Sequence, residues 1–510
     1  MTFAFARSSI AGRRKSGWLL ALVGMAPLLV EVGQPAAEWR ERRPNVLLIT
    51  ADDLGLQLSA YGETRIETPE LDRLASSGAF FDVAHVTQAS CSPSRASLLT
   101  GLYPHAHGQY GLVNANAGFK LHESLTGRTL PALLSSAGYR TGVVGKVHVA
   151  PASLLPWDHQ GPKDARNVRS VAAEVAGFLD EAAAGSAPFF LMVNFTDPHV
   201  FRLSAKRFGY ETSVDGIPEA PIEPSEETLF SFQGVDAPEQ RERVAGYLNG
   251  VLRLDAGVGL VMRALEDRNL SGSTLVIFCG DHGPPFARAK TTCYEAGLRV
   301  PLLVRWPGMA AGVRSRALVS TVDVMPTILD AAGIEPPEEL HGVSLAPLLE
   351  GEAAPSSWRS HLFAEYHFHG RRPFVPRRSI RGERFKLIEN LRAGEASPGT
   401  GIDDDTAFEI VWSERYDGSP ARRAFEVFAD PPARELYDLE ADPDEWINLS
   451  GDPRYAEIEA ALKEALDAWR TATADPLLDP EVVESFILLS ERGRKGPRGQ
   501  KYLETGKARD

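Results

Sequence analysis

The chain is poor in cysteine, and it has fewer basic than acidic residues. Only three of its 510 residues are Cys, too few for the disulfide framework that holds small secreted folds together. There are 54 Lys and Arg against 68 Asp and Glu, and the formal net charge of −14 argues against a nucleic-acid-binding protein. Hydrophobic residues make up 43%, so the chain is neither disordered nor collagen-like. Its length predicts two or three domains, each large enough to bury a core.

The first 37 residues differ from the rest and predict an export signal. Basic residues, including Arg13 and Arg14, precede an apolar run at residues 18–30, and the small residues Ala36 and Ala37 follow it. This order is typical of secretory signal peptides. The run is short for a bilayer span, so an uncleaved membrane anchor is only the alternative. We therefore expect an exported protein, either periplasmic or secreted.

Apolar runs alternate with helical patterns between residues 42 and 370. Buried strands are predicted at residues 45–50, 189–195, 274–279 and 300–305, and helices at residues 69–77 and 244–265. Runs that are apolar on both faces suit strands covered by helices on both sides. The pattern predicts an α/β domain with a mostly parallel sheet sandwiched by helices.

The pattern changes after about residue 370. Residues 385–388 predict a short strand, and Ile458, Leu462, Leu466 and Trp469 form one apolar stripe of a helix. We expect a smaller C-terminal α+β domain at residues 371–490. Residues 491–510 are rich in Gly, Lys and Arg and predict a disordered basic tail.

Acidic residues follow two of the predicted strands. Asp52 and Asp53 come just after the first strand, and Asp281 and His282 just after the strand at residues 274–279. Because the carboxyl ends of parallel strands meet at one edge of a sheet, we expect these side chains to lie together. Three carboxylates would repel one another without a cation, and oxygen ligands favour Ca²⁺ or Mg²⁺. The alternative is that each pair belongs to an ordinary turn or helix cap.

A third candidate feature is the motif Cys91-x-Pro93-x-Arg95. Pro93 fits the first turn of a helix, and Gly101 fits its end. Cys91 would then lie at a helix N-terminus, where free N–H groups and the helix dipole attract anions. Arg95 follows one turn later and offers a fork for an oxyanion. A small buried hydrophobic Cys is the alternative.

This motif, continued through residues 96–101, resembles the signature of type I sulfatases of the alkaline-phosphatase-like superfamily. The resemblance covers roughly residues 43–450, and further motifs follow in the family's order at residues 43–46, 52–53, 145–148, 197–199, 281–283, 290 and 294–301. It implies the alkaline-phosphatase-like fold. It also implies that a maturation enzyme oxidises Cys91 to formylglycine. Ca²⁺ would be held by Asp52, Asp53, Cys91, Asp281 and His282.

The resemblance further implies the catalytic roles. Formylglycine from Cys91 would attack sulfur with help from Asp281, while Arg95, Lys146 and Lys290 neutralise the sulfuryl oxygens. His199 would protonate the leaving group, and His148 would accept a proton when sulfate departs. Asp197 is a candidate substrate contact or a partner of another site residue. Outside this context, Lys146, His148, His199 and Lys290 would be ordinary loop residues.

Several segments resemble the heparan N-sulfatase (sulfamidase) branch more than arylsulfatases; they are residues 100–112, 145–151 and 283–286. Residues 365–369, with His367, resemble a segment that lines the sugar pocket there, and an edge strand is the alternative. The branch implies an N-sulfated glucosamine as substrate. O-sulfated sugars, phosphodiesters or phosphonates, and an inactive glycan-binding protein are the alternatives. The oligomeric state stays open, with a homodimer as one option.

Residues 371–386 form a basic segment in an otherwise acidic protein. Seven of its residues are positive and one is negative. We expect a rim, including Arg377 and Arg378, that contacts and steers a polyanionic sugar chain. The alternative is a set of ion pairs with acidic residues elsewhere. Of the other cysteines, Cys279 ends a predicted core strand, and Cys293 lies in a loop where spacing establishes no disulfide.

Overall fold

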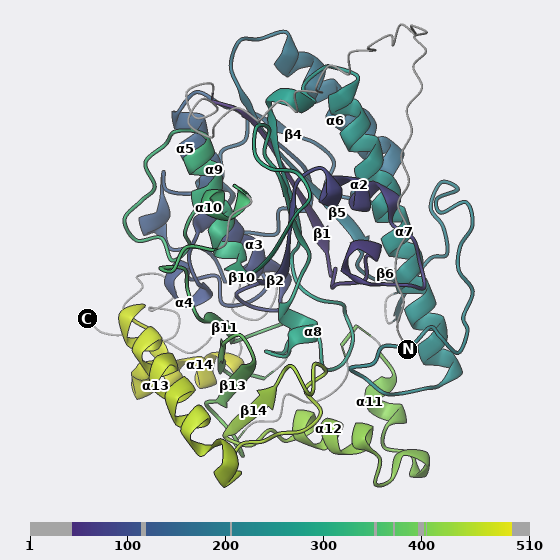
Figure 1. The fold of residues 1–510 in the computed structure, drawn as a ribbon, viewed down its shortest axis with the longest axis vertical. Helices are drawn as coiled ribbons and strands as arrows, with labels where there is room; N and C mark the ends of the chain where they lie inside the picture. The colour runs from purple at the N-terminus through teal and green to yellow at the C-terminus, as the bar shows by residue number, and fades with distance from the viewer. Residues whose placement is uncertain are drawn as a thin grey trace, which may run out of the picture. The chain divides into compact units, whose positions relative to one another are not determined.

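The centre of the fold is a mixed sheet between two layers of helices (Figure 1). The structure is a computed structural model that describes residues 43–113, 119–204, 207–350, 354–370, 373–395, 402–403 and 405–491. The predicted export signal and residues 492–510 of the predicted tail lie outside these ranges. Among the described residues, the sheet has eight strands in the order β10-β2-β9-β8-β1-β5-β3-β4. They are β1 Asn45–Asp52, β2 Ala79–His85, β3 Arg140–Gly145, β4 His159–Gln160, β5 Phe189–Pro198, β8 Thr274–Gly280, β9 Leu302–Arg305 and β10 Val313–Ser320.

The sheet is mostly parallel, as predicted. Strand β1 pairs in parallel with β5 and β8, and β3 pairs in parallel with β5 and β4. Only β9 runs antiparallel to its neighbours β8 and β2 within the described sheet. The carboxyl ends of β8, β1, β5 and β3 therefore point to one edge, where the predicted site residues follow.

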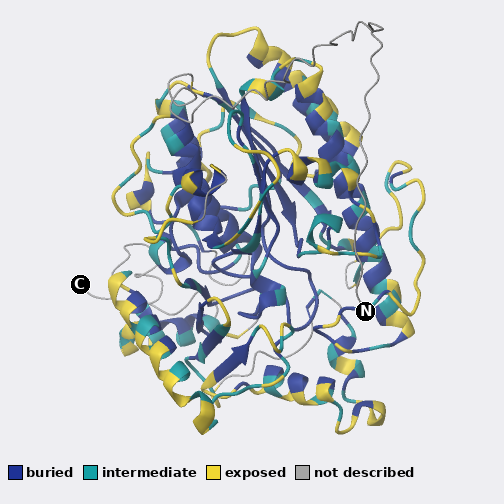
Figure 2. Cartoon of the chain, viewed as in Figure 1, coloured by how far each residue is buried: buried dark blue, intermediate teal, exposed yellow. Residues whose placement is uncertain are grey.

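Helices cover both faces of this sheet. They are α2 Pro69–Ser76, α3 Cys91–Thr100, α4 Pro104–His107, α5 Leu130–Ser136, α6 Val168–Ala183, α7 Pro238–Glu266, α8 Glu295–Leu298, α9 Val324–Ala331 and α10 Ala346–Leu349. Strand β1 shows why two layers are needed, because its side chains alternate between two cores. Leu47 and Ile49 pack with α2, α6 and α7, whereas Val46 and Leu48 pack with α3, α5, α9 and α10. Figure 2 shows the strands buried between these layers.

The predicted α+β texture of the C-terminal part is also present. An antiparallel sheet in the order β11-β12-β13-β14 consists of β11 Leu362–Tyr366, β12 Arg377–Arg381, β13 Phe385–Asn390 and β14 Arg434–Asp438. Four helices accompany it; they are α11 Ala407–Ile410, α12 Pro420–Ala429, α13 Ala456–Ala472 and α14 Pro480–Glu491. The predicted stripe of α13 packs Leu462, Leu466 and Trp469 against this sheet. The sheet begins before residue 371, and the described residues belong to one compact unit.

A separate two-stranded hairpin, β6 Phe201–Ser204 with β7 Arg207–Gly209, follows β5. It matters here because it continues the loop that carries a predicted catalytic histidine. Within the described ranges, none of the helices has the length and apolar character that a membrane span requires.

Candidate active site

Four neighbouring parallel strands deliver the predicted site residues to one edge of the sheet. Asp52 ends β1 and Asp53 follows it, while Asp281 and His282 follow β8. Asp197 is the next-to-last residue of β5, and His199 lies just beyond the strand. Lys146 and His148 follow β3. The strand order places these four ends side by side. The sequence argument from strand ends therefore predicted the right edge.

Backbone conformation at two of these ends is unusual. Asp53 has φ +67°, in the left-handed region that non-glycine residues seldom adopt. Gly145 has φ +91°, and a Cβ there would meet the Asn194 carbonyl oxygen at 2.0 Å. Only glycine fits at this turn, which aims Lys146 at the centre of the site.

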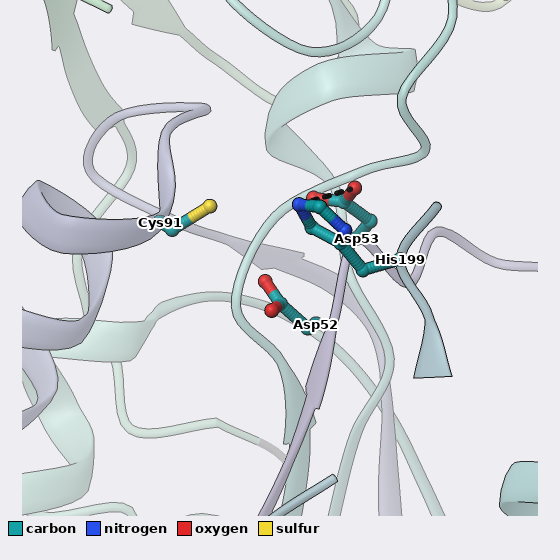
Figure 3. Close-up of side chains that lie close together, drawn as sticks. All are labelled: Asp52, Asp53, Cys91 and His199. Carbon is teal, nitrogen blue, oxygen red and sulfur yellow. Dashed lines mark ion pairs between the residues drawn. The ribbon is translucent and has the colours of Figure 1, made fainter. Parts of the chain in front are cut away.

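Helix α3 begins at Cys91, as predicted, and ends before Gly101 with φ +67°. All ten side chains of α3 are buried, and Cys91 is 2% exposed. Its Sγ lies 3.3 Å from Nε2 of His282. Figure 3 shows Cys91 with Asp52, Asp53 and His199 around one small space.

The buried acidic residues of this space fit a hard cation. Ligand atoms of Asp52, Asp281, His282 and Cys91 lie within 4.8 Å of one another, and a second such group joins Asp52, Asp53, Cys91 and His199. Oδ1 of Asp52 is fully buried and accepts no hydrogen bond from the described residues. A divalent ion would satisfy this oxygen, and carboxylate oxygens are the donors that Ca²⁺ prefers.

The pKa values of Asp281 and His282 reflect the same concentration of buried negative charge. Burial and the charge of Asp52 raise the pKa of Asp281. Burial lowers the pKa of His282, but the charges of Asp281, Cys91 and Asp53 outweigh it and raise the pKa to about 9. Protonated His282 thus supplies one of the positive charges that this cluster demands, and a bound cation would compete with that proton.

Three permanent cations surround the cluster. Nε of Arg95 donates to Asp281 at 2.9 Å, and Nζ of Lys146 donates to Asp52 at 2.6 Å. Nζ of Lys290 lies 3.0 Å from Oδ1 of Asp53. Nη2 of Arg95 has no hydrogen-bond partner among the described residues. The sequence predicted these cations as anion ligands, and the structure brings all of them to the acidic cluster.

The two predicted histidines flank the space differently. Burial and the charge of Lys146 lower the pKa of His148 to about 3, so its ring is neutral. Its buried Nδ1 lacks a hydrogen-bond partner within the described chain. His199 is more accessible, with Nε2 3.8 Å from Oδ2 of Asp53 and Nδ1 2.8 Å from the Val200 carbonyl oxygen. The fixed Nδ1 leaves Nε2 facing the site.

Asp197 holds the His199 loop through two arginines that the sequence did not reveal. Arg253 on α7 donates to both of its oxygens at 2.7 and 2.8 Å, and Arg166 reaches it at 3.4 Å. Arg166 also donates to the carbonyl oxygens of His199 and Val200. Of the two roles predicted for Asp197, this geometry favours the partner of another site residue. Lone arginines on a loop and a helix carry no motif that could have identified them.

Two further residues near the site were missed. Oδ2 of Asp403 lies 2.9 Å from Nζ of Lys290. Nδ1 of His369 lies 2.8 Å from Oγ of Ser90, the residue before Cys91. Residues 365–369 had been singled out, but Asp403 lies in an acidic run that gives no signal of its own.

The prediction of an exposed basic rim is wrong for Arg377 and Arg378. Both are buried, at 1% and 0% exposure, because their strand β12 lies between β11 and β13. Arg378 donates to Asp475 at 2.6 and 2.8 Å and lies 3.5 Å from Glu365. The alternative of ion pairs with acidic residues is confirmed for Arg378. Arg371 and Arg372 lie outside the described residues.

His367, the predicted contact in a sugar pocket, lies in the interior of the described structure. It is fully buried, with Nε2 3.5 Å from Glu365 and its ring edge-on to Tyr110. Neither ring nitrogen has a hydrogen-bond partner among the described residues. Burial alone does not decide its role, because Cys91 and Lys290 are buried as well, and its part in substrate binding stays a prediction. Cys279 and Cys293 are free and buried, and burial raises their pKa values to about 12 and about 11.

The fold and the site define a hydrolase class in which buried carboxylates and cations surround a nucleophile at a helix N-terminus. Comparison with known proteins is more specific. The Sulfatase family model matches residues 44–334, and the model named N-sulphoglucosamine sulphohydrolase, C-terminal, matches residues 280–397. The chain belongs to the sulfatase family.

Individual relatives agree with this assignment. The chain is 35% identical to human N-sulphoglucosamine sulphohydrolase, covering 86% of this chain and 92% of the relative. It is 32% identical to human arylsulfatase A, covering 83% and 87%. The crystal structure of a phosphonate monoester hydrolase of Agrobacterium radiobacter superposes with a TM-score of 0.60 at 22% identity, covering 84% and 96%. This last likeness concerns the alkaline-phosphatase-like fold alone.

Proposed function

We propose that this sulfatase removes the N-sulfate from a glucosamine at the end of a sulfated sugar chain, using formylglycine made from Cys91 and a bound Ca²⁺. One observation carries the proposal. Cys91 is the first residue of a buried helix, and its Sγ faces His282 within the cluster of Asp52 and Asp281. A nucleophile there would meet an anion held by the surrounding cations.

Asp52, Asp53, Asp281 and His282 are the residues that would hold Ca²⁺, together with the modified Cys91. The ion would supply positive charge to the sulfuryl oxygens and fix their orientation. Formylglycine would supply a hydrated aldehyde, which offers two hydroxyl groups where cysteine offers one thiol. The positive charge of Ca²⁺ suits this site, because the carboxylates of the site already offset the positive charge of its own basic residues.

The chain's own residues would bind the anion and move the protons. Lys146 contacts Asp52 and Lys290 contacts Asp53, and both ammonium groups would contact the sulfuryl oxygens. His148 is neutral and would accept a proton at its ring. Nε2 of His199 would donate a proton to the leaving nitrogen, a step that an amine leaving group needs because an amide anion is a poor one. Asp197 and Arg166 would keep His199 in place.

The choice of an N-sulfated sugar is supported by the C-terminal family match over residues 280–397 and by the 35% identical relative. The similarity to arylsulfatase A favours an O-sulfated substrate as the second candidate. We further propose that residues 1–37 export the protein to the periplasm or the medium. A formylglycine-generating enzyme would be its maturation partner, and a homodimer is a proposal that sedimentation can test.

The experiment is a sulfate-release assay with calcium on two glucosamines, one with only an N-sulfate and one with only a 6-O-sulfate. The proposal expects release from the N-sulfated sugar. Release from the O-sulfated sugar alone would overturn the N-sulfate assignment and retain the sulfatase. If neither sugar reacts, the mass of the peptide containing Cys91 tells whether the aldehyde is present, and activity is then tested on matured protein.

A further inference from the structure

Asp403 stands apart from the acidic cluster that would bind calcium. Its Oδ2 lies 2.9 Å from Nζ of Lys290, whose other anionic contact is Asp53. The side chain of Lys290 is 1% exposed, whereas that of Asp403 is 18% exposed. The Asp403 carboxylate thus lies on the solvent side of the buried ammonium group, where an entering substrate would meet it.

The surroundings of Asp403 keep its carboxylate charged and in place. Burial raises its pKa, but the positive charges of Lys290, His199 and His369 outweigh burial and hold the pKa well below its usual range. Arg243 on α7 donates to the backbone carbonyl oxygen of Asp403. The carboxylate is therefore a fixed negative charge against Lys290, close enough to His199 for the two charges to interact.

A purely structural role for the ion pair between Asp403 and Lys290 would not explain why Lys290 has a second carboxylate partner. Asp53 already neutralises Lys290 from the buried side, and Arg243 already anchors the backbone of Asp403. A second carboxylate at the accessible face of a site for anions is costly for binding any negatively charged group near it. Such repulsion is a means of discriminating between substrates.

We infer that Asp403 is a specificity-determining residue that admits a sugar with a free hydroxyl beside the cleaved sulfate and rejects one with a second sulfate there. The inference rests on the proposed function. A carboxylate accepts a hydrogen bond from the neighbouring hydroxyl, and this interaction orients the ring. A sulfate on the same carbon would place two negative groups in contact in a partly desolvated site.

The test compares two sugars in the same preparations: glucosamine with only an N-sulfate, and glucosamine with an N-sulfate and a 3-O-sulfate. The variant is Asp403→Asn, which keeps the size and one acceptor oxygen but removes the charge. Wild type should prefer the singly sulfated sugar at least about tenfold in kcat/KM, and D403N should shrink that preference at least about tenfold. Using a ratio cancels any difference in the amount of folded enzyme.

Asp417→Asn is the matched control, because Asp417 belongs to the same C-terminal part but is exposed and pairs with Arg422 at 3.7 Å. D417N should leave the ratio as in wild type. An unchanged ratio in D403N, or an equal loss on both sugars, would overturn the role of Asp403.

Binding separates this inference from the proposed function. If wild type whose Cys91 peptide carries the aldehyde releases sulfate from neither sugar, the N-sulfatase proposal fails. Calorimetry with Cys91→Ala, with and without D403N, then compares the affinities for the same two intact sugars. The affinity ratio should fall in the double variant, and an unchanged ratio would refute the selectivity of Asp403 independently of turnover.

Discussion

Truncating the Arg378 side chain should lower the denaturant concentration at which the protein unfolds. Its guanidinium contacts Asp475 through two hydrogen bonds and lies 3.5 Å from Glu365, and all three side chains are fully buried. Breaking a buried pair by deleting one partner costs roughly 3–5 kcal/mol, since a charge is left uncompensated. Arg470 still holds Asp475 at 2.8 Å and His105 still holds Glu365 at 2.7 Å. We therefore expect Arg378→Ala to lose about 3 kcal/mol, the lower end of that range.

Urea unfolding followed by tryptophan fluorescence provides the assay, because Trp469 stacks on Phe363 of the same sheet. Arg384→Ala is the matched control. Arg384 contacts Asp438 at 2.6 Å in similar geometry, but its side chain is 51% exposed and water screens the pair. R384A should therefore have the smaller effect. Equal midpoints for R378A and R384A would refute the reasoning from burial.

Acid should narrow the difference between wild type and R378A. Burial raises the pKa values of Glu365 and Asp475, but the nearby cations outweigh burial and lower both below their usual values. Such depressed carboxyl pKa values stabilise the folded state above the unfolded pKa of about 4, and this contribution is lost as pH falls below it. A constant difference from about pH 6 down to about pH 3 would contradict the ion-pair explanation.

Four further predictions concern the catalytic centre. Cys91→Ser should lose activity roughly 100-fold or more, or trap sulfate on the protein, which intact-protein mass measures; full multiple turnover would refute the aldehyde mechanism. Removing calcium should lower the melting temperature, and Asp52→Asn should abolish that shift because it removes a buried ligand oxygen; an unchanged difference would argue against the metal site. His148→Gln should lower kcat on the order of 100-fold across about pH 5 to 8, since its pKa of about 3 keeps the wild-type ring neutral throughout; a loss confined to acid would contradict this. Arg166→Ala should lower kcat more than it changes KM, because it frees the His199 loop without touching the sulfate; a change in KM alone would speak against this.

Much of the site could be predicted because its residues follow strands. Asp52 and Asp281 stand directly after apolar runs, and parallel pairing of β1 with β8 brings those ends together. Arg378 could not be placed in the same way. Its partner Asp475 is 97 residues further along the chain, and charge counting over a short segment cannot show such a contact. The basic segment consequently suggested a surface where the fold has an interior network.

The fold was predictable to a similar degree and for similar reasons. Strands β1, β5 and β8 and helices α2 and α13 appear at their predicted positions within a few residues, whereas α7 begins six residues before its predicted start at residue 244. The antiparallel direction of β9 could not be predicted, because its apolar composition is the same as that of a parallel strand. The N-terminus of α2 shows why local signals are incomplete. Thr68 precedes the helix but its side chain makes no capping hydrogen bond, and the distant Asp255 instead accepts from the Leu71 amide at 2.8 Å.

The burial of helix α3 bears on the order in which folding and oxidation of Cys91 would have to occur. Every side chain from Cys91 to Thr100 is buried, so another enzyme could not bind this segment in the folded chain. A catalyst that oxidises Cys91 must therefore reach it while the chain is still extended. If Cys91 is converted to formylglycine, the conversion has to precede folding, and a molecule that folds first would retain its thiol.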